Sequence, residues 1–268
     1  IIRQLNLSPE TFLNEEDLKF QDLTTYDKED DLHKIGALID CTYDTSYLKE
    51  RNLCLTSNGN LIKRDKQGFL PEMVGDLYND RVNVKKEMKK SKKLLEELLL
   101  NKDNMDANEF KNRKKELESL VAAQHNEQLA IKVLMNSLYG QLGNQYCRWY
   151  DIRIPRSITT TGQTLIRYIA RKMNTHLNEL CETENIDYII AIDTDSNYLN
   201  LENVYNKLEM KSIDDLDKFI ENDLEPFIDK CFREYYDYMN HFDFQMKMKR
   251  EAIADRGIFI NKKKRYAL

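Results

Sequence analysis

The sequence lacks the features that mark membrane, secreted and zinc-binding proteins. It contains no apolar run of 18 residues and no signal-peptide pattern, so we expect neither a transmembrane helix nor secretion. Its five cysteines are scattered without a C-x-x-C pair, which argues against a disulfide framework or zinc site and favours free thiols in a reducing compartment. The four histidines are equally dispersed, which argues against a histidine-based metal site. Glycine and proline are scarce, and no repeat or low-complexity segment is present.

Charged residues, by contrast, are abundant. They make up 32% of the 268 residues, and the net charge is −5. This acidic balance at first disfavours a nucleic-acid partner, but binding depends on where the charges lie. Lysines cluster at 85–93, 111–115 and 262–265, whereas the acids gather elsewhere. A solvated helix face explains each cluster equally well, so the clusters alone leave the partner open.

The middle of the chain predicts a protruding helical hairpin. Residues 51–70 are typical of a β-hairpin, with Asn58-Gly59 as the turn. A helical pattern then runs from Pro71 to about residue 100, and a second one covers about 107–139. Each helix would be roughly 45–50 Å long. On periodicity alone, a purely structural coiled coil is the alternative interpretation of residues 71–140.

The remaining pattern mixes helices with antiparallel strands. We expect helices over 160–182 and 213–239, and two strands around a tight turn in 188–201. Residues 242–249 alternate between apolar and polar and predict a half-buried strand, and 257–260 predict another. The expected fold class is therefore α+β, with antiparallel strands backed by helices and the helical hairpin inserted between them.

Two aspartates form the first candidate site. Asp193 and Asp195 lie one residue apart in a strand–turn–strand segment, where side chains two apart can project on the same side. Two neighbouring carboxylates repel each other unless a hard cation such as Mg²⁺ lies between them. Taken alone, D-x-D also occurs in ordinary surface turns and in nucleotide-sugar glycosyltransferases, so several interpretations stay open.

The second candidate site is the segment KVLMNSLYG, residues 132–140. Lys132, Asn136, Tyr139 and Gly140 share one face of the second long helix. Lysine supplies a point charge for phosphate, tyrosine a flat surface for a base pair, and glycine permits close backbone approach.

Arg81 and Lys85 add two cations on the first long helix, spaced i, i+4. If the two helices are antiparallel neighbours, these cations and Lys132 could converge on one polyanion. An ordinary surface charge pattern is the alternative for the pair on its own.

The two candidate sites together resemble a known motif pair. K-x-x-x-N-S-x-Y-G over 132–140, followed by D-T-D-S at 193–196, resembles the motifs of family B (Pol α-like) DNA polymerases. The segments IIRQLNLSPETF, NSLYGQLGNQYCRWYD, TTTGQTLIRYIARKMN and REAIADRGIFINKKKRYAL resemble the replicative polymerases of large tailed phages. The resemblance covers nearly the whole chain, more weakly at 13–50 and 202–240.

The resemblance implies a domain organisation and a catalytic site. Residues 1–70 and 141–268 would belong to an antiparallel palm that ends at the start of the thumb, and 71–140 would be the fingers. Two Mg²⁺ ions, replaceable by Mn²⁺, would bind the catalytic Asp193 and Asp195, with Glu251 as a further metal ligand.

The resemblance also implies binding residues. The dNTP would be bound by Arg81, Lys85, Lys132, Asn136 and Tyr139, with Lys132 also taking part in catalysis. DNA would be contacted by Gly140, Lys263, Lys264, Arg265 and Tyr266.

The implied reaction is template-directed addition of a dNTP to a primer 3′-hydroxyl by two-metal phosphoryl transfer. Its partners would be primer–template DNA, dNTPs, an upstream segment with the exonuclease and the first palm motif, a downstream thumb, and a sliding clamp. The implied location is the cytoplasm, that of the host cell if a phage encodes the protein.

Two departures from the family pattern qualify this expectation. Ile192 stands where glycine usually precedes D-T-D-S. The family's D-x-x-S-L-Y-P-S segment, which supplies another metal-binding aspartate and the tyrosine that excludes ribonucleotides, does not precede Ile1 in this sequence. We therefore expect the isolated chain to be inactive. The alternative function is a non-catalytic DNA-binding or assembly fragment of a split replication protein.

Overall fold

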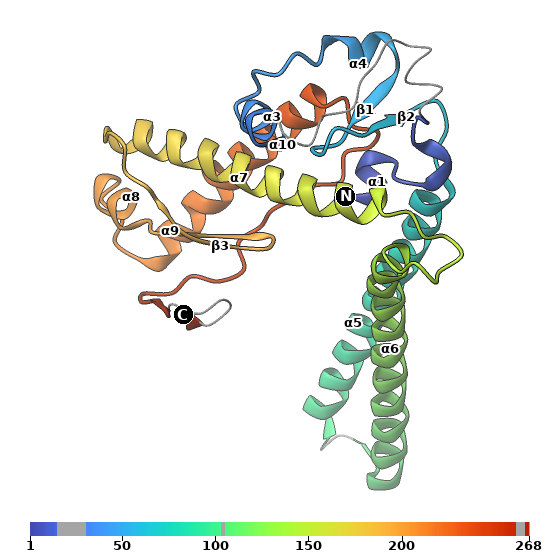
Figure 1. Cartoon of the computed structure of the whole chain (residues 1–268). Coiled ribbons are helices and arrows are strands. Elements are labelled where there is room, and N and C mark those ends of the chain that lie inside the picture. The colour runs from blue at the N-terminus through green and yellow to red at the C-terminus, as the bar shows by residue number, and fades with distance from the viewer. Residues whose placement is uncertain (15–30, 103–104, 261–265, 268) are drawn as a thin grey trace.

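The computed structural model describes residues 1–14, 31–102, 105–260 and 266–267. Figure 1 shows a body of helices and short strands crossed by one long helix, with a helical hairpin projecting away from it. The described residues are mostly helical, and their strands are short.

The N-terminal part combines short helices with a β-hairpin. Its elements are α1 (Ile2–Leu5), η1 (Pro9–Thr11), α3 (Asp31–Ile39), α4 (Ser46–Glu50), β1 (Leu53–Leu55) and β2 (Leu61–Lys63). Leu55 pairs with Leu61, and Gly59 in the connecting turn has a φ of 85°, a conformation that favours glycine. The β-hairpin predicted within 51–70 is confirmed.

The projecting part is a pair of antiparallel helices, α5 (Phe69–Leu100) and α6 (Ala107–Leu142). Pro71 lies in the first turn of α5, where its missing N–H is not needed. Asp106 caps α6 by accepting hydrogen bonds from the backbone N–H groups of Asn108 and Glu109 at 3.0 and 3.1 Å. The protruding helical hairpin predicted over 71–140 is confirmed.

The two helices meet along a seam with the heptad spacing of a coiled coil. Buried or half-buried residues recur at alternating steps of three and four, which is the pattern of facing helices. On α5 they are Val74, Leu77, Arg81, Val84, Met88, Ser91, Leu95 and Leu98. On α6 they are Phe110, Lys114, Leu117, Val121, Gln124, Gln128, Ile131, Met135, Leu138 and Leu142. The seam therefore includes polar side chains near its middle.

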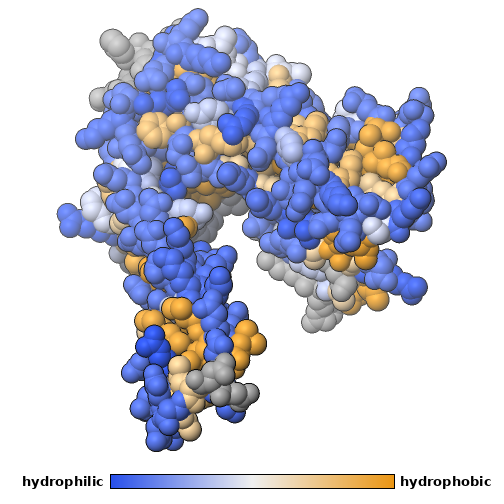
Figure 2. Space-filling view, turned by 180° about the vertical axis from the view of Figure 1, so that it is seen from behind, coloured by the Kyte–Doolittle hydropathy of each residue, from blue (hydrophilic) through white to orange (hydrophobic). Residues whose placement is uncertain are grey.

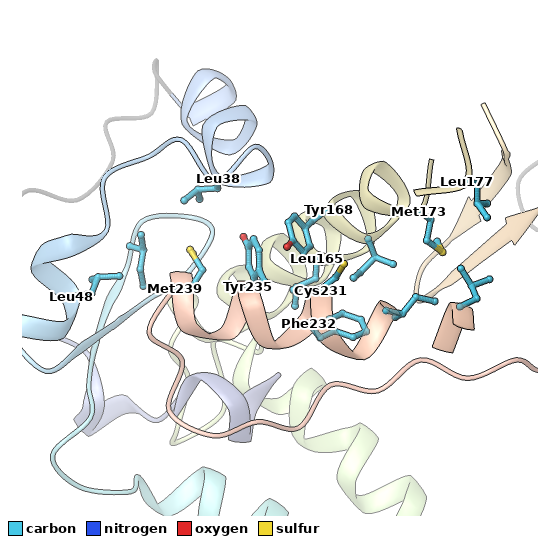
Figure 3. Close-up of a cluster of buried hydrophobic side chains, with 14 of the residues drawn as sticks. Leu38, Leu48, Leu165, Tyr168, Met173, Leu177, Cys231, Phe232, Tyr235 and Met239 are labelled. Carbon is cyan, nitrogen blue, oxygen red and sulfur yellow. The ribbon is translucent and has the colours of Figure 1, made fainter. Parts of the chain in front are cut away.

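Helix α7 (Arg153–Cys181) runs through the main hydrophobic core. Its apolar face packs with side chains from the N-terminal part and from α10 (Glu225–Tyr238), as Figure 3 shows for Tyr168, Met173, Phe232 and others. The helix begins earlier than the predicted 160–182, because Pro155 falls in its first turn, where proline is tolerated.

A second, smaller core joins the helical hairpin to the body. Its buried residues come from α1, η1's flank, the β1–β2 hairpin and the ends of α5, α6 and α7: Leu5, Leu7, Phe12, Cys54, Ile62, Leu70, Leu142 and Ile154. This cluster holds the base of the hairpin in place.

The C-terminal half contains further helices and two short hairpins. The elements are β3 (Ile189–Asp193), β4 (Ser196–Leu199), α8 (Glu202–Lys207), α9 (Ile213–Phe219), a π-helical turn η3 (Ile220–Leu224), α10, β5 (Ile258–Phe259) and β6 (Tyr266–Ala267). The predicted strands at 188–201 and 257–260 and the helix over 213–239 are confirmed. None of the described helices is both long and apolar enough to cross a membrane.

The strands do not join into the single sheet that we expected. Among the described residues they form three separate antiparallel hairpins, β1–β2, β3–β4 and β5–β6. The α+β prediction is thus confirmed only as a mostly helical protein with small antiparallel strand pairs.

The strand predicted over 242–249 is wrong. The segment forms no strand ladder, although Phe244, Met246 and Met248 pack against the main core and Lys247 and Lys249 are exposed. Alternating apolar and polar residues indicate that one side of an extended segment is buried. A β-strand also requires a neighbouring strand that forms hydrogen bonds with its backbone N–H and C=O groups. None of the described strands pairs with this segment.

Candidate functional site

The β3–β4 hairpin presents Asp193 and Asp195 at its turn. Asp193 pairs with Ser196 across the hairpin, and the Asp195 N–H donates to the Asp193 carbonyl at 2.7 Å. Between them Thr194 has a φ of 56°, a left-handed conformation that is costly for a β-branched residue. Its hydroxyl donates to Asp193 Oδ1 at 3.1 Å. The strained turn therefore places both aspartates at one end of the hairpin.

The β5–β6 hairpin lies against this turn through its aromatic side chains. The Tyr266 ring contacts Tyr198 and Phe259, with ring centroids 5.0 and 5.7 Å apart, and its hydroxyl donates to Asp193 Oδ2 at 3.4 Å. Hydrogen bonding to Tyr198 raises the pKa of Tyr266 to about 12, so the hydroxyl stays protonated as a donor. Tyr266 thus lies beside the carboxylates.

The donor set at the turn fits a magnesium ion in its chemistry. Carboxylate oxygens are hard ligands, and Mg²⁺ uses one or two of them and completes its shell with water and phosphate oxygens. Asp195 is exposed, and none of the described side chains donates to its carboxylate. Among the described residues, no three His, Cys, Asp or Glu side chains form a group that could hold a metal ion. Glu251, which is exposed and follows the 242–249 segment, is therefore not grouped with Asp193 and Asp195 in such a cluster. Its role as a ligand stays a prediction.

The register of the helical hairpin follows from two grooves along it. Tyr78 of α5 and Met135 of α6 line one groove near the base, and Leu95 and Glu118 line another nearer the tip. Both helices rise about 1.5 Å per residue and run in opposite directions. Two residues therefore lie at the same level if one follows a facing residue on the first helix by as many positions as the other precedes the facing residue on the second helix.

This register places two of the candidate cations at the same level along the helical hairpin. Arg81 follows Tyr78 by three residues, and Lys132 precedes Met135 by three, so the two lie level on neighbouring helices. Arg81 is half-buried in the seam, and its Nε is buried without a hydrogen-bond partner among the described residues. Lys132 and Lys85 are exposed, with Lys85 one turn nearer the tip.

A groove of about 630 Å³ lies below these cations, at the base of the hairpin. Asn136 and Tyr139 line it together with Arg3, Tyr78 and Gln245 from other parts of the chain. The groove therefore gathers two of the candidate binding residues with partners that the sequence did not indicate.

Tyr139 is oriented by a residue of α7. Its hydroxyl is 3.0 Å from Thr159 Oγ1, and the Thr159 hydroxyl lies 2.8 Å from the carbonyl of Pro155, to which it donates. Since the proton of Thr159 is engaged there, Tyr139 donates to Thr159. Gly140, the next residue, is exposed, and an added Cβ would meet nothing within 4 Å, so its backbone is open to approach.

Sequence patterns could not have found several residues of the site. Thr159, Gln245 and Arg3 are not among the site residues that the sequence predicted, and each meets Tyr139 or its groove from a distant part of the chain. Three of the predicted DNA-binding residues, Lys263, Lys264 and Arg265, lie outside the described residues.

The two halves of the candidate site face a common space. In Figure 1 the turn of the β3–β4 hairpin points to the side on which α5 and α6 project. Figure 2 shows, from behind, a hollow between the helical hairpin and the lobe that carries the strands.

Comparisons with known proteins agree with the motif pair. The family described as DNA polymerase family B matches residues 107–268. Over the whole chain, the sequence is 34% identical to the DNA-directed DNA polymerase of Escherichia phage RB69 and 30% identical to that of Enterobacteria phage T4. It is also 27% identical to DNA polymerase 1 of Pyrococcus abyssi, over 78% of this chain and 20% of that protein. The chain spans 32% of the length of each of the two phage relatives.

Proposed function

Because the chain belongs to the family B DNA polymerases, we propose that it is part of a catalytic domain that adds dNTPs to a primer 3′-hydroxyl under the direction of a template. In this proposal residues 71–140 are the fingers, and 1–70 and 141–268 contribute to the palm. The observation that carries the proposal is the groove at the base of the helical hairpin. It gathers Asn136 and Tyr139 directly below the level of Arg81 and Lys132.

The acidic turn supplies the metal-binding half of the proposal. Asp193 and Asp195 would hold divalent ions, which the family uses and which, when bound, stabilise charge on the attacking and leaving oxygens. Thr194 and Tyr266 each donate a hydrogen bond to Asp193, which orients its carboxylate toward one end of the hairpin. The Asp195 carboxylate accepts from none of the described groups, so its oxygens are available as ligands.

The helical hairpin supplies the nucleotide-binding half. Arg81, Lys85 and Lys132 would neutralise the triphosphate, and Lys132 would offset charge that develops on the leaving pyrophosphate. Asn136 would support the nucleotide from the same helix face. Tyr139, held by Thr159, would present its ring to the edge of the new base pair, where Gly140 allows close approach of DNA.

Nucleotide binding by the chain tests this proposal without requiring turnover. We expect a dNTP to bind in a metal-dependent manner, and Lys132→Ala to weaken binding about ten- to hundredfold, because a charge-assisted contact contributes about 1.5–3 kcal/mol. The measurement is calorimetric titration with and without Mg²⁺.

A lysine far from the groove serves as the control. Lys111 is exposed near the opposite end of α6, so Lys111→Ala should leave dNTP affinity unchanged. Equal effects of the two substitutions, or binding that Mg²⁺ does not alter, would contradict the proposed nucleotide site.

A further inference from the structure

The groove nearer the tip of the helical hairpin lies on the same face as the groove at its base. Tyr78 and Tyr139 line the groove at the base, and Lys92 and His125 line the one nearer the tip. Lys92 follows Tyr78 by two heptads and His125 precedes Tyr139 by two heptads, and side chains on a coiled-coil helix return to the same face every seven residues. One face of the hairpin, which we call the groove face, therefore carries both grooves.

The groove nearer the tip has an aliphatic floor. Its volume is about 310 Å³, and Leu95, Val121 and Ala122 line it. Leu99 follows Leu95 by one helical turn, Leu129 follows Ala122 by two, and these two leucines are 46% and 43% exposed. They extend the floor toward the tip and toward the base, respectively. From the level of Leu99 to that of Leu129 the aliphatic surface is roughly 20 Å long, which is about four turns of a helix.

Lysines flank this aliphatic floor. Lys89 and Lys92 on α5 and Lys115 on α6 are exposed, and none of the three forms an ion pair with an acidic side chain among the described residues. Two acids share the face: Glu96 lies one turn beyond Lys92, and Glu118 lines the groove but is paired with a lysine of α6 at 3.6 Å. The surface around the groove is therefore positive, although the net charge of the chain is −5.

An aliphatic groove between two antiparallel helices, flanked by lysines, fits an acidic amphipathic helix. The apolar side of such a helix packs into the groove as a third helix, and its carboxylates reach the lysines. A nucleic acid is a poorer match, because none of the residues that line this groove is a Phe, Tyr or Trp on which a base could stack. We propose that the groove face between Leu99 and Leu129 docks an acidic amphipathic helix of a partner protein. The proposal does not rest on the proposed nucleotide site, because it uses none of the residues of that site.

Calorimetric titration of the whole chain with a synthetic peptide tests the docking site. The probe is an acetylated peptide of about three heptads, with leucine at heptad positions a and d and with glutamate or alanine elsewhere. We expect it to bind without metal or dNTP, and its affinity to fall as salt is added, because salt screens the attraction between carboxylates and lysines. A peptide of the same composition with scattered leucines, and one with lysine in place of glutamate, should not bind.

Two neighbouring alanines of α6 form a matched pair of variants. Ala122 and Ala123 are both exposed, but only Ala122 lines the groove. Ala122→Glu should weaken binding of the acidic peptide about tenfold or more, because it places a carboxylate against the apolar side of the peptide. Ala123→Glu should leave the affinity unchanged, and both variants should keep the circular dichroism spectrum of the unsubstituted chain.

A second pair of variants, on α5, isolates the contribution of charge. Lys92→Glu should weaken peptide binding about fivefold and reduce its dependence on salt, because an attraction is replaced by a repulsion. Lys86 is exposed and lies two residues from each of the seam residues Val84 and Met88, so it faces away from α6. Lys86→Glu should therefore change neither the affinity nor its salt dependence.

Three results would each overturn the proposal: no binding of the acidic peptide, equal binding of the peptide with scattered leucines, or undiminished affinity of the Ala122→Glu variant. Displacement of the peptide by an equal concentration of oligothymidylate would also overturn it, because the groove face would then bind phosphates. So would self-association that Ala122→Glu abolishes, since a second copy of the chain would then occupy the groove. The assay contains neither metal nor dNTP, so its failure is distinct from failure of the proposed nucleotide site.

Discussion

His241 shows how a single buried residue ties distant segments together. It is fully buried, and Gln4 Nε2 donates to its Nδ1 at 2.8 Å, while Arg64 donates to its carbonyl at 3.1 Å. The Phe242 N–H donates to the Gln4 carbonyl at 2.8 Å. Burial is the main cause that lowers the pKa of His241 to about 3, so the imidazole is neutral in the folded protein.

This burial makes stability depend on pH. In the unfolded chain a histidine titrates near 6.5, so protons bind the unfolded state first as the pH falls. The stabilisation that comes from keeping His241 neutral is fully present above pH 6.5, and it decreases as the pH falls from there toward pH 3. Between pH 7.5 and pH 5 we expect the free energy of unfolding to fall by about 2 kcal/mol from this group, as measured by urea titration.

Substitution separates this effect from those of other groups. His241→Gln removes the titrating ring and should flatten the pH dependence, whereas His125→Gln, at an exposed position on α6, should not. An unchanged pH dependence in the His241 variant would count against a neutral buried imidazole.

At the scale of the element, the α5–α6 hairpin combines a coiled-coil seam with polar residues in it. Arg81, Ser91, Lys114, Gln124 and Gln128 are the polar residues of a seam that is otherwise apolar. Polar seam residues lower the stability of a coiled coil but restrict its register. Register matters here because it sets Arg81 level with Lys132.

Gln124 allows the stability cost to be measured. Its Oε1 is buried without a hydrogen-bond partner among the described residues. Gln124→Leu removes this unsatisfied acceptor, and we expect it to raise the free energy of unfolding by about 1 kcal/mol in urea titrations followed by circular dichroism. Gln141→Leu, at an exposed position on the same helix, should change it little. A lower free energy of unfolding for Gln124→Leu than for the unsubstituted chain would contradict the placement of Gln124 in the buried seam.

At the scale of the whole molecule, the hollow between the helical hairpin and the strand-bearing lobe separates the two halves of the proposed site. Among the described residues, no third His, Cys, Asp or Glu joins Asp193 and Asp195 in a group that could hold a metal ion. Since the chain spans 32% of each phage relative, other segments of a polymerase would have to complete the site.

Primer extension tests this dependence. We expect little extension by the chain alone, and restoration when it is mixed with a polypeptide that ends in the family's D-x-x-S-L-Y-P-S segment. Asp195→Ala should abolish the restored activity, because it removes a metal ligand. Asp214 is an exposed acid in the first turn of α9, so Asp214→Ala is the control and should retain the restored primer extension. Full extension by the Asp195 variant would refute the assignment of the catalytic turn.

Local patterns in the sequence determined much of this protein. Apolar periodicity located α5, α6 and the C-terminal part of α7, because helix faces repeat every three to four residues whatever they contact. The Asn58-Gly59 turn followed from the backbone preferences of two adjacent residues. The motif pair indicated the family, which the match over residues 107–268 confirms.

Only the tertiary structure decided which of these elements meet. A helix face does not specify its partner's register, so the level placement of Arg81 and Lys132 was an open question in the sequence. The bonds from Tyr139 to Thr159 and from Tyr266 to Asp193 join residues with no shared local pattern. The 242–249 segment makes the same point, because its alternation predicted burial correctly while strand pairing depended on a neighbour that the fold does not place there. Side-chain periodicity is a local property, whereas pairing depends on the path of the whole chain.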